Sequence, residues 1–456
     1  MKQQFNISHL LIVFLLFNVQ VFAQQKTSLK FIVAPYLTHM TDNSFQVSWE
    51  TSEAVKGTIY LAESEYDTFE PEFKIAATEN TKTHFHRLFI HDLSANELYH
   101  YQVINSGKNG DTLKGPVTPI TIANYTQSAI SFSVVGDTQG NPVVWQRIAE
   151  LMAQKNPQFI VHVGDLVQYG PNKDDWTDEF FKPANNLLSY TPLYPAIGNH
   201  EMNDEKFYEY FGLPFDDAFY SIKKGELILI FVDTNKDILP GSEQYRKLEH
   251  LLASSQEQWK IVVHHHPIFT SDKNSYRSSL MAASTKGDPN ITHLKNLYVS
   301  YAVDLTLSGH VHGYERTLPI LKNHINKEEG VTHIVSGGGG GRFKRIPYEN
   351  NWFLAEALHE NHYLNISIRE NKLQVEAIDT TGVIFDSWKK EKILGHANLS
   401  TPLINATKKY FIDSTSVSIE NTNKSKSINY RLNEGGYNTA FRNVNSLILY
   451  NTTTVS

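Results

Sequence analysis

The hydrophobic residues in the first part of the chain occupy alternate positions. Residues 45–49 and 99–103 both place an apolar or aromatic side chain at every second position. A period of two is typical of a strand that buries one of its faces. Clusters of turn-forming residues, such as 41–43 and 108–111, separate these runs. The pattern therefore predicts an all-β sandwich domain over residues 28–124.

One tyrosine in this region has a spacing that is found in sandwich domains. Tyr99 follows Leu93 by six residues, which is the arrangement of a corner tyrosine whose hydroxyl bonds back to the upstream backbone. The stretch resembles a fibronectin type III-like domain. That resemblance implies a structural role for residues 28–124.

The pattern changes after a polar link at residues 123–127. Apolar runs now alternate with amphipathic stretches, which include Val144–Lys155 and Glu243–Ala253. Nearly continuous apolar strands that alternate with helices predict a layered α/β architecture with largely buried sheets. We expect this domain to cover residues 129–388. Its predicted strands are Ile130–Val135, Phe159–Val163, Leu227–Val232, Trp259–Val263 and Leu305–Leu307.

Residues 1–23 have the composition of an export signal. Lys2 precedes an apolar run over Leu10–Phe17, and Val21 and Ala23 occupy the third and the last position before a cleavage site after Ala23. A buried first strand or a membrane anchor is the alternative. The run is too short to cross roughly 30 Å of hydrocarbon comfortably. We therefore expect export to the periplasm or the extracellular space, with no membrane span.

The C-terminal segment, residues 395–456, is rich in Asn, Ser and Thr and ends with a strand-like run at Ser446–Tyr450. It resembles the small β-sandwich modules appended to exported glycoside hydrolases, of the chitobiase C-terminal type. That resemblance implies a β-rich module that contacts glycan or cell wall. A solvated cap or linker explains the same composition.

Composition narrows the class of function. A chain of 456 residues exceeds the size at which one hydrophobic core stops growing. The 48 acidic residues exceed the 41 basic ones and give a net charge of −7, which disfavours nucleic acid and anionic membranes as main partners. Because cysteine is absent, thiolate metal sites and a cysteine nucleophile are excluded. Histidine is plentiful, with 20 residues, and the positions of these residues decide the interpretation.

Five short polar motifs follow one another through the α/β region, most of them directly after a predicted strand. Each motif alone is weak, because Gly-Asp and Gly-Asn pairs are common in ordinary turns. Six of the chain's histidines nevertheless fall within them, and the carboxyl ends of strands are where open α/β sheets place ligands. Carboxylate, amide and imidazole donors without sulfur suit Mn, Fe or Zn. The motifs are Gly136-Asp137-Thr138-Gln139, Gly164-Asp165-Leu166, Gly198-Asn199-His200-Glu201, His264-His265-His266-Pro267 and Gly309-His310-Val311-His312.

This ordered set resembles the calcineurin-like metallophosphoesterases and, within them, the purple acid phosphatases. The resemblance covers roughly residues 30–388, because the sandwich domain in front also matches the purple acid phosphatase arrangement. Tyr314-Glu315-Arg316 and the glycine run over residues 337–341 sharpen it. The resemblance implies a layered αββα sandwich for the α/β domain, and two metal ions as cofactors, in some combination of Fe, Zn and Mn.

The resemblance also implies a role for each matching residue. Asp165 is expected to bridge both ions, with one carboxylate oxygen to each. His200 is the candidate for phosphate contact and for protonating the leaving group. Of the three consecutive histidines, His265 is expected to be the ligand because it stands two residues before Pro267. The implied ligands are Asp137, Asp165 and His312 for the first ion, and Asp165, Asn199, His265 and His310 for the second.

The chain departs from the purple enzymes at one ligand. Those enzymes have a tyrosine three residues after the bridging aspartate, and this chain has Gln168 there, with Tyr169 one residue later. Gln139, Gln168 and Tyr169 therefore remain alternative candidates for the last donor to the first ion. The departure puts the colour and the ferric preference of the purple enzymes in question for this chain.

We expect an exported dinuclear phosphoesterase that acts on small phosphate monoesters through a metal-bound hydroxide. A phosphodiesterase acting on cyclic nucleotides, nucleic-acid linkages or lipid head groups is an alternative, because the same ion pair serves both reactions. A third possibility, from another class, is a surface-binding or adhesion protein in which the α/β domain is a scaffold.

Overall fold

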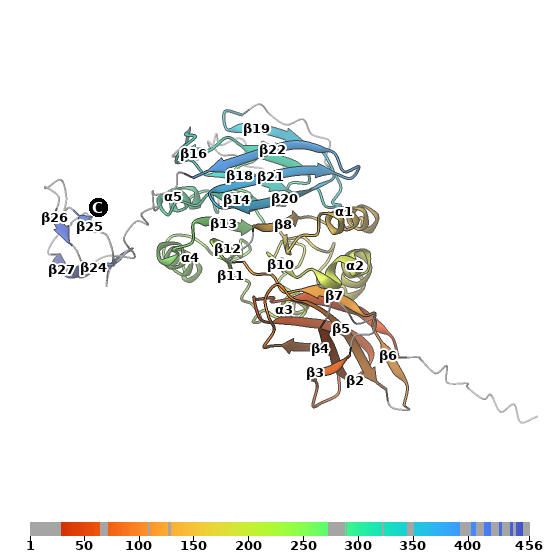
Figure 1. Ribbon diagram of the computed structural model, residues 1–456. Helices are drawn as coiled ribbons and strands as arrows, with labels where there is room; N and C mark the ends of the chain where they lie inside the picture. Colours follow the sequence, from red (N-terminus) through yellow and green to blue (C-terminus); the bar gives the residue numbers. More distant parts are fainter. Residues whose placement is uncertain are drawn as a thin grey trace, which may run out of the picture.

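The computed structural model describes residues 29–63, 72–107, 110–125, 129–271, 288, 290–321, 323–343 and 351–392, together with the strands found between 403 and 449. The predicted export signal, residues 1–23, lies outside the described part of the chain. Figure 1 shows two described domains in contact, with the first strands below and the larger α/β domain above.

The N-terminal domain is a β-sandwich whose two sheets share one long strand, β2. The first half of β2 pairs with β1 and β4, and its second half pairs with β3 and β5. The backbone N–H of Ser94 donates to the hydroxyl of Tyr99 at 2.9 Å, so Tyr99 makes the corner contact expected from its spacing. The strands are β1 (Phe31–Thr38), β2 (Phe45–Glu63), β3 (Lys74–Thr78), β4 (Thr83–Ile90), β5 (Leu98–Ser106), β6 (Thr112–Lys114) and β7 (Thr118–Thr121).

Two sheets form the centre of the second domain. The first sheet has the order β10-β9-β8-β20-β21-β22, and its strands β8, β9 and β10 are parallel. Its members are β8 (Ile130–Val135), β9 (Phe159–His162), β10 (Leu193–Pro195), β20 (His362–Arg369), β21 (Lys372–Asp379) and β22 (Ile384–Glu391). The last of these strands contains Trp388, near which the domain was expected to end.

The second sheet has the order β11-β12-β13-β14-β18-β15-β19, with β12, β13, β14 and β18 parallel. A two-stranded hairpin, β16 (Ile320–Leu321) with β17 (His324–Ile325), follows β15. The sheet consists of β11 (Tyr220–Lys224), β12 (Leu227–Val232), β13 (Trp259–His264), β14 (Leu305–Ser308), β15 (Tyr314–Thr317), β18 (Thr332–Ser336) and β19 (Leu354–Leu358).

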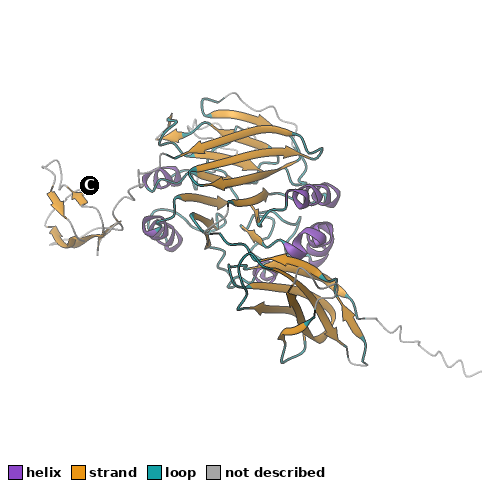
Figure 2. Cartoon of the chain, in the orientation of Figure 1, coloured by secondary structure: helices purple, strands orange, loops and turns teal. Residues whose placement is uncertain are grey.

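Helices cover the outer face of each sheet and complete four layers (Figure 2). One core cluster lies between the two sheets, with Phe132, Val163 and Leu307 among its members. A second cluster joins the first sheet to α1 and α2, and a third joins the second sheet to α4 and α5. The helices are α1 (Pro142–Lys155), the π-helix η1 (Asp175–Phe181), α2 (Lys182–Tyr190), α3 (Glu205–Phe211), α4 (Glu243–Ser254) and α5 (Leu294–Ser300). The predicted layered α/β architecture is confirmed.

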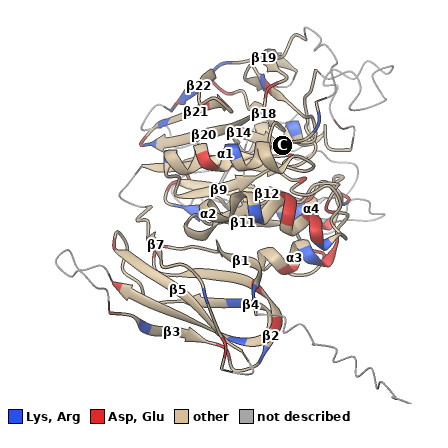
Figure 3. Ribbon diagram, turned by 90° about the vertical axis from the view of Figure 1, so that its right-hand side faces the viewer, with Lys and Arg blue, Asp and Glu red and all other residues tan. Residues whose placement is uncertain are grey.

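Local sequence explains where the two predicted helices begin. The side chain of Asn141 accepts a hydrogen bond from the N–H of Val144 in the first turn of α1, and Pro142 fits the first helical position. Ser242 caps α4 in the same way through the N–H of Tyr245. Figure 3 shows that acidic and basic residues are interspersed on α4, as expected for a solvated helix face.

The sandwich and the α/β domain meet along a polar junction. The hydroxyl of Tyr36 donates to the carbonyl of Tyr210 at 2.6 Å, and that of Tyr101 donates to the carbonyl of Ser189 at 2.5 Å. The hydroxyl of Tyr194 contacts both backbone groups of Met40, each at 3.1 Å. These buried hydrogen bonds fix the orientation of the sandwich on the larger domain.

The C-terminal segment contributes strands in two small sheets. β23 (Leu403–Ala406), β24 (Thr415–Glu420) and β27 (Val444–Leu449) form one, and β25 (Ile428–Tyr430) pairs with β26 (Asn438–Ala440). Contact with glycan or cell wall through residues 395–456 depends on side chains outside the described part. Within the described residues, no helix combines the length and apolar character needed to cross a bilayer.

Candidate metal centre

The five polar motifs lie in loops at the carboxyl ends of five strands. Asp137, Asp165 and Asn199 follow β8, β9 and β10 of the first sheet, and His265 and His310 follow β13 and β14 of the second. Asp137, Asp165 and His310 have φ values of 57°, 57° and 68°. The left-handed region is uncommon for residues other than glycine, and strained backbone of this kind is concentrated at functional sites.

Asn199, His265 and His310, which we call the second-ion half, bring their donor atoms into mutual contact. The Oδ1 atom of Asn199 lies 3.0 Å from His265 Nε2 and 2.9 Å from His310 Nδ1. The two imidazole nitrogens are 3.3 Å apart. Ligands bound at about 2.1 Å from one ion lie about 3.0 to 3.4 Å from each other, so this spacing fits a single bound ion.

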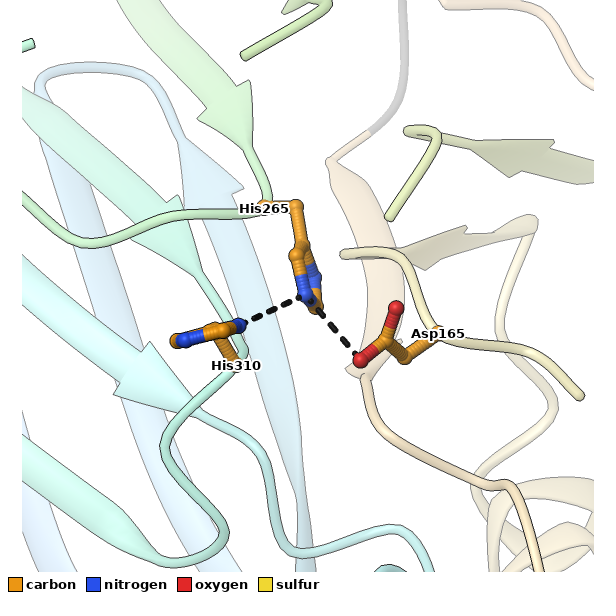
Figure 4. Close-up of side chains that lie close together, drawn as sticks. All are labelled: Asp165, His265 and His310. Carbon is orange, nitrogen blue, oxygen red and sulfur yellow. Dashed lines mark hydrogen bonds and ion pairs between the residues drawn. The ribbon is translucent and has the colours of Figure 1, made fainter. Parts of the chain in front are cut away.

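Asp165 lies between the second-ion half and the rest of the cluster. Its Oδ2 atom is 3.2 Å from His265 Nε2, and Figure 4 shows His265 between the carboxylate and His310. One donor atom from each of these three residues lies within 4.8 Å of the others. The Oδ1 atom of Asp165 accepts the backbone N–H of His200 at 2.9 Å. The two carboxylate oxygens of Asp165 thus face different partners, Oδ2 the ring of His265 and Oδ1 the backbone of His200.

Asp137 and His312, which we call the first-ion half, lie on the other side of Asp165. Asp137 Oδ1 is 3.6 Å from His312 Nε2. The backbone N–H of His310 donates to both carboxylate oxygens of Asp137, at 2.9 and 3.0 Å. The structure therefore brings together all six residues that the sequence suggested as metal ligands.

Two of the histidines are oriented by the backbone. His265 Nδ1 donates to the carbonyl of Val163 at 3.0 Å, and His312 Nδ1 donates to the carbonyl of Arg342 at 2.8 Å. These bonds place the opposite nitrogen, Nε2, toward the cluster in both rings. Metal-binding histidines are held by the same kind of contact.

Glycines allow the backbone to pass close to the cluster. A Cβ atom on Gly198 would lie 2.2 Å from Asp165 Oδ1, and one on Gly309 would lie 2.3 Å from Asp137 Oδ2. In the glycine run, a Cβ on Gly341 would come within 2.7 Å of the His312 ring. The run also donates backbone N–H groups to the Asp137 loop, from Gly341 to the carbonyl of Asp137 at 2.7 Å. The run therefore forms a wall of the site.

The cluster concentrates buried carboxylates. Asp137 and Asp165 are 0% and 1% exposed. Burial raises the pKa of Asp137 well above its usual range, and the charge of Asp165 adds to this. Burial alone would also raise the pKa of Asp165, but the charge of His265 and its hydrogen bond lower it below the usual range. A bound cation would favour the ionised form of both carboxyl groups.

His265 carries the compensating charge when no ion is present. Burial opposes protonation of the ring, but the neighbouring carboxylate of Asp165 raises the pKa of His265 to about 9. An ion must displace this proton in order to bind Nε2. The buried oxygen and nitrogen donors, with backbone-oriented imidazoles and no sulfur, therefore fit Zn, Mn or Fe.

Glu201 is a site residue for which the sequence predicted no role. It is fully buried. Its carboxylate accepts the backbone N–H groups of Gly198 and Leu166, both at 2.7 Å, and that of Asp165 at 3.0 Å. Glu201 thus holds the Asp165 loop against the Asn199 loop. Its place in the Gly198-Asn199-His200-Glu201 motif indicated that it lies near the site but did not indicate this role.

His200 lies at the open side of the cluster. Its ring Nδ1 donates to the carbonyl of Gln168 at 2.7 Å, and its Nε2 is 3.9 Å from Asp165 Oδ2. The side chain is 30% exposed, whereas His265 is fully buried. His200 therefore lies at the exposed edge of the cluster.

The neighbouring histidines of His265 have other surroundings. His264 stacks on Tyr298, with ring centroids 6.2 Å apart. His266 contacts the Thr234 hydroxyl through Nδ1 at 2.8 Å, and its ring lies 4.7 Å from that of His310. The choice of His265 from the three agrees with this geometry.

The Tyr314-Glu315-Arg316 segment forms a structural network behind the site. Tyr314 and Arg316 both donate to Asp386 of β22, at 2.6 and 2.7 Å. Glu315 accepts from the Thr270 hydroxyl and from Ser271. The segment thus links β15 to the other sheet and to the loop after β13, as expected for a supporting element.

Comparison with known proteins shows which proteins this chain is similar to. Residues 130–314 match the model of the calcineurin-like phosphoesterases. The chain is 28% identical over 355 residues to probable inactive purple acid phosphatase 1 of Arabidopsis thaliana, covering 67% of this chain and 56% of that protein. It is 26% identical over 265 residues to acid phosphatase type 7 of Danio rerio, covering 48% of this chain and 58% of that protein.

The solved structures agree on the fold. Purple acid phosphatase PPD1 from yellow lupin (Lupinus luteus) seeds superimposes with a TM-score of 0.67 at 20% identity, covering 79% of this chain and 74% of that one. The fold is thus that of the purple acid phosphatases, with a β-rich domain in front of the α/β domain. Among the curated relatives, this chain spans only 56%, 35% and 49% of the lengths of three Arabidopsis thaliana proteins, each of them called a probable inactive purple acid phosphatase.

Proposed function

Because this chain carries a calcineurin-like phosphoesterase domain over residues 130–314, we propose that it is an exported phosphomonoesterase that uses two metal ions. The single observation that carries the proposal is the crowding of ligand atoms around Asp165. His265 Nε2 lies 3.2 Å from Asp165 Oδ2 and 3.0 Å from Asn199 Oδ1. Such crowding requires a proton or a cation between the atoms, because all three are acceptors when His265 is neutral.

Two bound ions would supply a hydroxide near neutral pH and would neutralise charge on the phosphate. Asp137 and His312 would hold the first ion, and Asn199, His265 and His310 the second. Asp165 would hold both ions, and the backbone N–H of His200, which donates to its Oδ1, would orient the carboxylate. The loops of the chain would hold these donor atoms in place before substrate binds. Glu201 contributes by accepting hydrogen bonds from three backbone N–H groups of the two loops.

His200 would bind the phosphate and protonate the departing oxygen. Its Nδ1–H is committed to the Gln168 carbonyl at 2.7 Å, so the proton that can be transferred sits on Nε2. That nitrogen faces the same side as Asp165 Oδ2, at 3.9 Å. An acid fixed in this way contributes typically about 100-fold to 10,000-fold to a rate.

Hydrolysis by the purified protein tests the proposal. The substrates are p-nitrophenyl phosphate and bis-p-nitrophenyl phosphate, with metal content measured on the same samples. Faster hydrolysis of the monoester, with two ions per chain, supports the proposal. Faster hydrolysis of the diester would replace it with a phosphodiesterase. Absence of both bound metal and turnover would favour the alternative of a surface-binding protein with a scaffold α/β domain.

Export forms the second part of the proposal and rests on the sequence of residues 1–23. Expression of the full chain in a bacterial host, followed by mass spectrometry of the secreted or periplasmic fraction, tests it directly. A mature N-terminus at Gln24 is the expected result. Retention of residues 1–23 on a cytoplasmic product would contradict export.

A further inference from the structure

We propose that Gln139 is a metal ligand, and that its side-chain amide oxygen completes the first-ion half. The inference rests on the proposed function, because it assumes an ion between Asp137 and His312. It selects one of three candidates, since the sequence leaves Gln139, Gln168 and Tyr169 equally available. It also predicts which kind of ion that half prefers.

The position of Gln139 is the first support. The residue is 2% exposed and lies two positions after Asp137, in the loop that follows β8. Its Nε2 atom is 3.4 Å from Asp165 Oδ2 and 3.3 Å from His312 Nε2. The amide group therefore contacts donor atoms from two different loops, and both of those atoms belong to the proposed ligand set.

The other amide atom provides the second support. Gln139 Oε1 is buried and has no hydrogen-bond partner among the residues that the structure describes. A buried carbonyl without a partner is unfavourable. The two ends of an amide are almost the same size. A half-turn of the group would bring Oε1 next to Asp165 and His312 and would break the two contacts that Nε2 makes there, so the turned amide needs a cation between these atoms.

The two rival residues have other surroundings. Gln168 lies beside His200, with its Nε2 3.3 Å from His200 Nδ1, and its backbone N–H donates to Glu179. Tyr169 is 50% exposed, whereas Asp137 is fully buried beside Gln139. Neither rival shows the contact with Asp165 and His312 that Gln139 makes.

The chemical consequence concerns charge. A tyrosinate is an anionic donor, but an amide oxygen is neutral, so the first-ion half would contain Asp137, a share of Asp165, and the neutral groups of Gln139 and His312. Less negative charge favours a divalent ion over a ferric one. An iron-loaded sample would also lack the visible absorption band that arises from a tyrosinate bound to ferric iron.

Direct metal binding tests this inference. The protein is stripped with a chelator and reloaded with Zn²⁺ or Mn²⁺, and its metal content and dissociation constants are measured by mass spectrometry of the elements and by chelator competition. The test variant is Gln139→Leu, which keeps the volume and removes the oxygen. Gln139→Glu restores an oxygen donor, and Gln168→Leu is the matched control. Far-ultraviolet circular dichroism checks that each variant folds.

We expect wild-type protein and Gln168→Leu to bind two ions, and Gln139→Leu to bind the first at least about 10-fold more weakly, since even indirect partners of a ligand cost about 10-fold to 100-fold. Gln139→Glu should recover the binding. If Gln139→Leu is unstable, Gln139→Glu keeps the test valid, because its metal binding is measured on a folded protein.

Two results would overturn the inference while leaving the proposed function intact. One is unchanged binding of both ions by Gln139→Leu. The other is a visible band in the iron-loaded wild-type protein that disappears in Tyr169→Phe. Failure of the wild-type protein itself to bind any ion would instead overturn the proposed function, and the inference with it.

Discussion

The metal centre and the junction between the two domains both bury charged or titratable groups, but the partners of these groups differ between the two regions. At the junction, Lys224 donates to the carbonyl of Met40 and lies over the ring of Tyr125 at 4.4 Å. At the metal centre, His265, Asn199 and Asp165 turn acceptor atoms toward one another. The amine of Lys224 thus has its partners within the protein, whereas the metal centre places several possible ligand atoms around one point. Substitutions at the junction should therefore affect folding, and substitutions at the metal centre should affect catalysis.

The strongest test of this contrast is Asp165→Asn. We expect kcat/KM to fall by at least about 1,000-fold, because a neutral amide lacks the negative charge that would hold two cations. Metal content should fall, while the midpoint of denaturant unfolding of the metal-free protein changes little. Asp233→Asn, at the end of β12 and equally buried at 1% exposure, serves as control and should keep its activity. An Asp165→Asn protein with normal metal content and turnover would contradict the shared role of Asp165.

The next largest effect is expected for His200→Gln. Loss of the acid should lower kcat by about 100-fold to 10,000-fold, while the metal content stays at the wild-type value because His200 is not among the ligands. His250→Gln, at an exposed position on α4, is the matched control. A loss of bound metal in His200→Gln would instead assign the residue to the ion site.

Lys224→Met tests the junction through pH. Burial lowers the pKa of Lys224 from 10.5 to about 7, so between these values the unfolded chain holds a proton that the folded chain lacks. The contribution of Lys224 to the free energy of unfolding therefore increases as the pH rises from 7, by up to about 1.4 kcal/mol per pH unit. Relative to Lys224→Met, the wild-type free energy of unfolding should be larger near about pH 9 than near about pH 7. Equal differences at both pH values would show that Lys224 stays protonated in the folded protein.

The smallest expected effect compares two buried tyrosines. Tyr36→Phe removes the 2.6 Å bond to the carbonyl of Tyr210 and should lower the free energy of unfolding by about 1 kcal/mol. Tyr208 is also buried, but its hydroxyl has no hydrogen-bond partner among the described residues, so Tyr208→Phe should be neutral or slightly stabilising. Urea unfolding measures both. A larger loss for Tyr208→Phe would point to a partner outside the described residues.

Much of the α/β domain could be predicted because its central strands are buried on both faces. Ile130–Val135 is mostly apolar and Leu227–Val232 is a continuous apolar run, and both form strands with these bounds. The alternation in residues 45–49 likewise indicated a strand, but it did not show that β2 continues to Glu63 and joins two sheets. Strand order was also beyond reach, because the pairing of β20 with β8 joins residues far apart in the sequence.

The sequence predicted which residues form the site better than it predicted their contacts. Motif order brought the six proposed ligands together, since the loops all follow strand ends. The role of Glu201 could not be seen, because it accepts hydrogen bonds from backbone N–H groups, which leave no mark in side-chain patterns. The same limit applies to Asp165, whose Oδ1 is committed to the N–H of His200. The choice between Gln139 and Gln168 required side-chain contacts.

Each half of the metal centre takes donors from both sheets. Asp137 follows β8 of the first sheet and His312 follows β14 of the second, and Asn199 and His265 divide between the sheets in the same way. Ions bound there would cross-link the two layers, and mass action would stabilise the folded chain by about 2.7 kcal/mol at an ion concentration one hundred times the dissociation constant. Chelation should then lower the melting temperature as well as the activity. The resistance of this protein to heat and proteases would therefore depend on the metal supply of its surroundings.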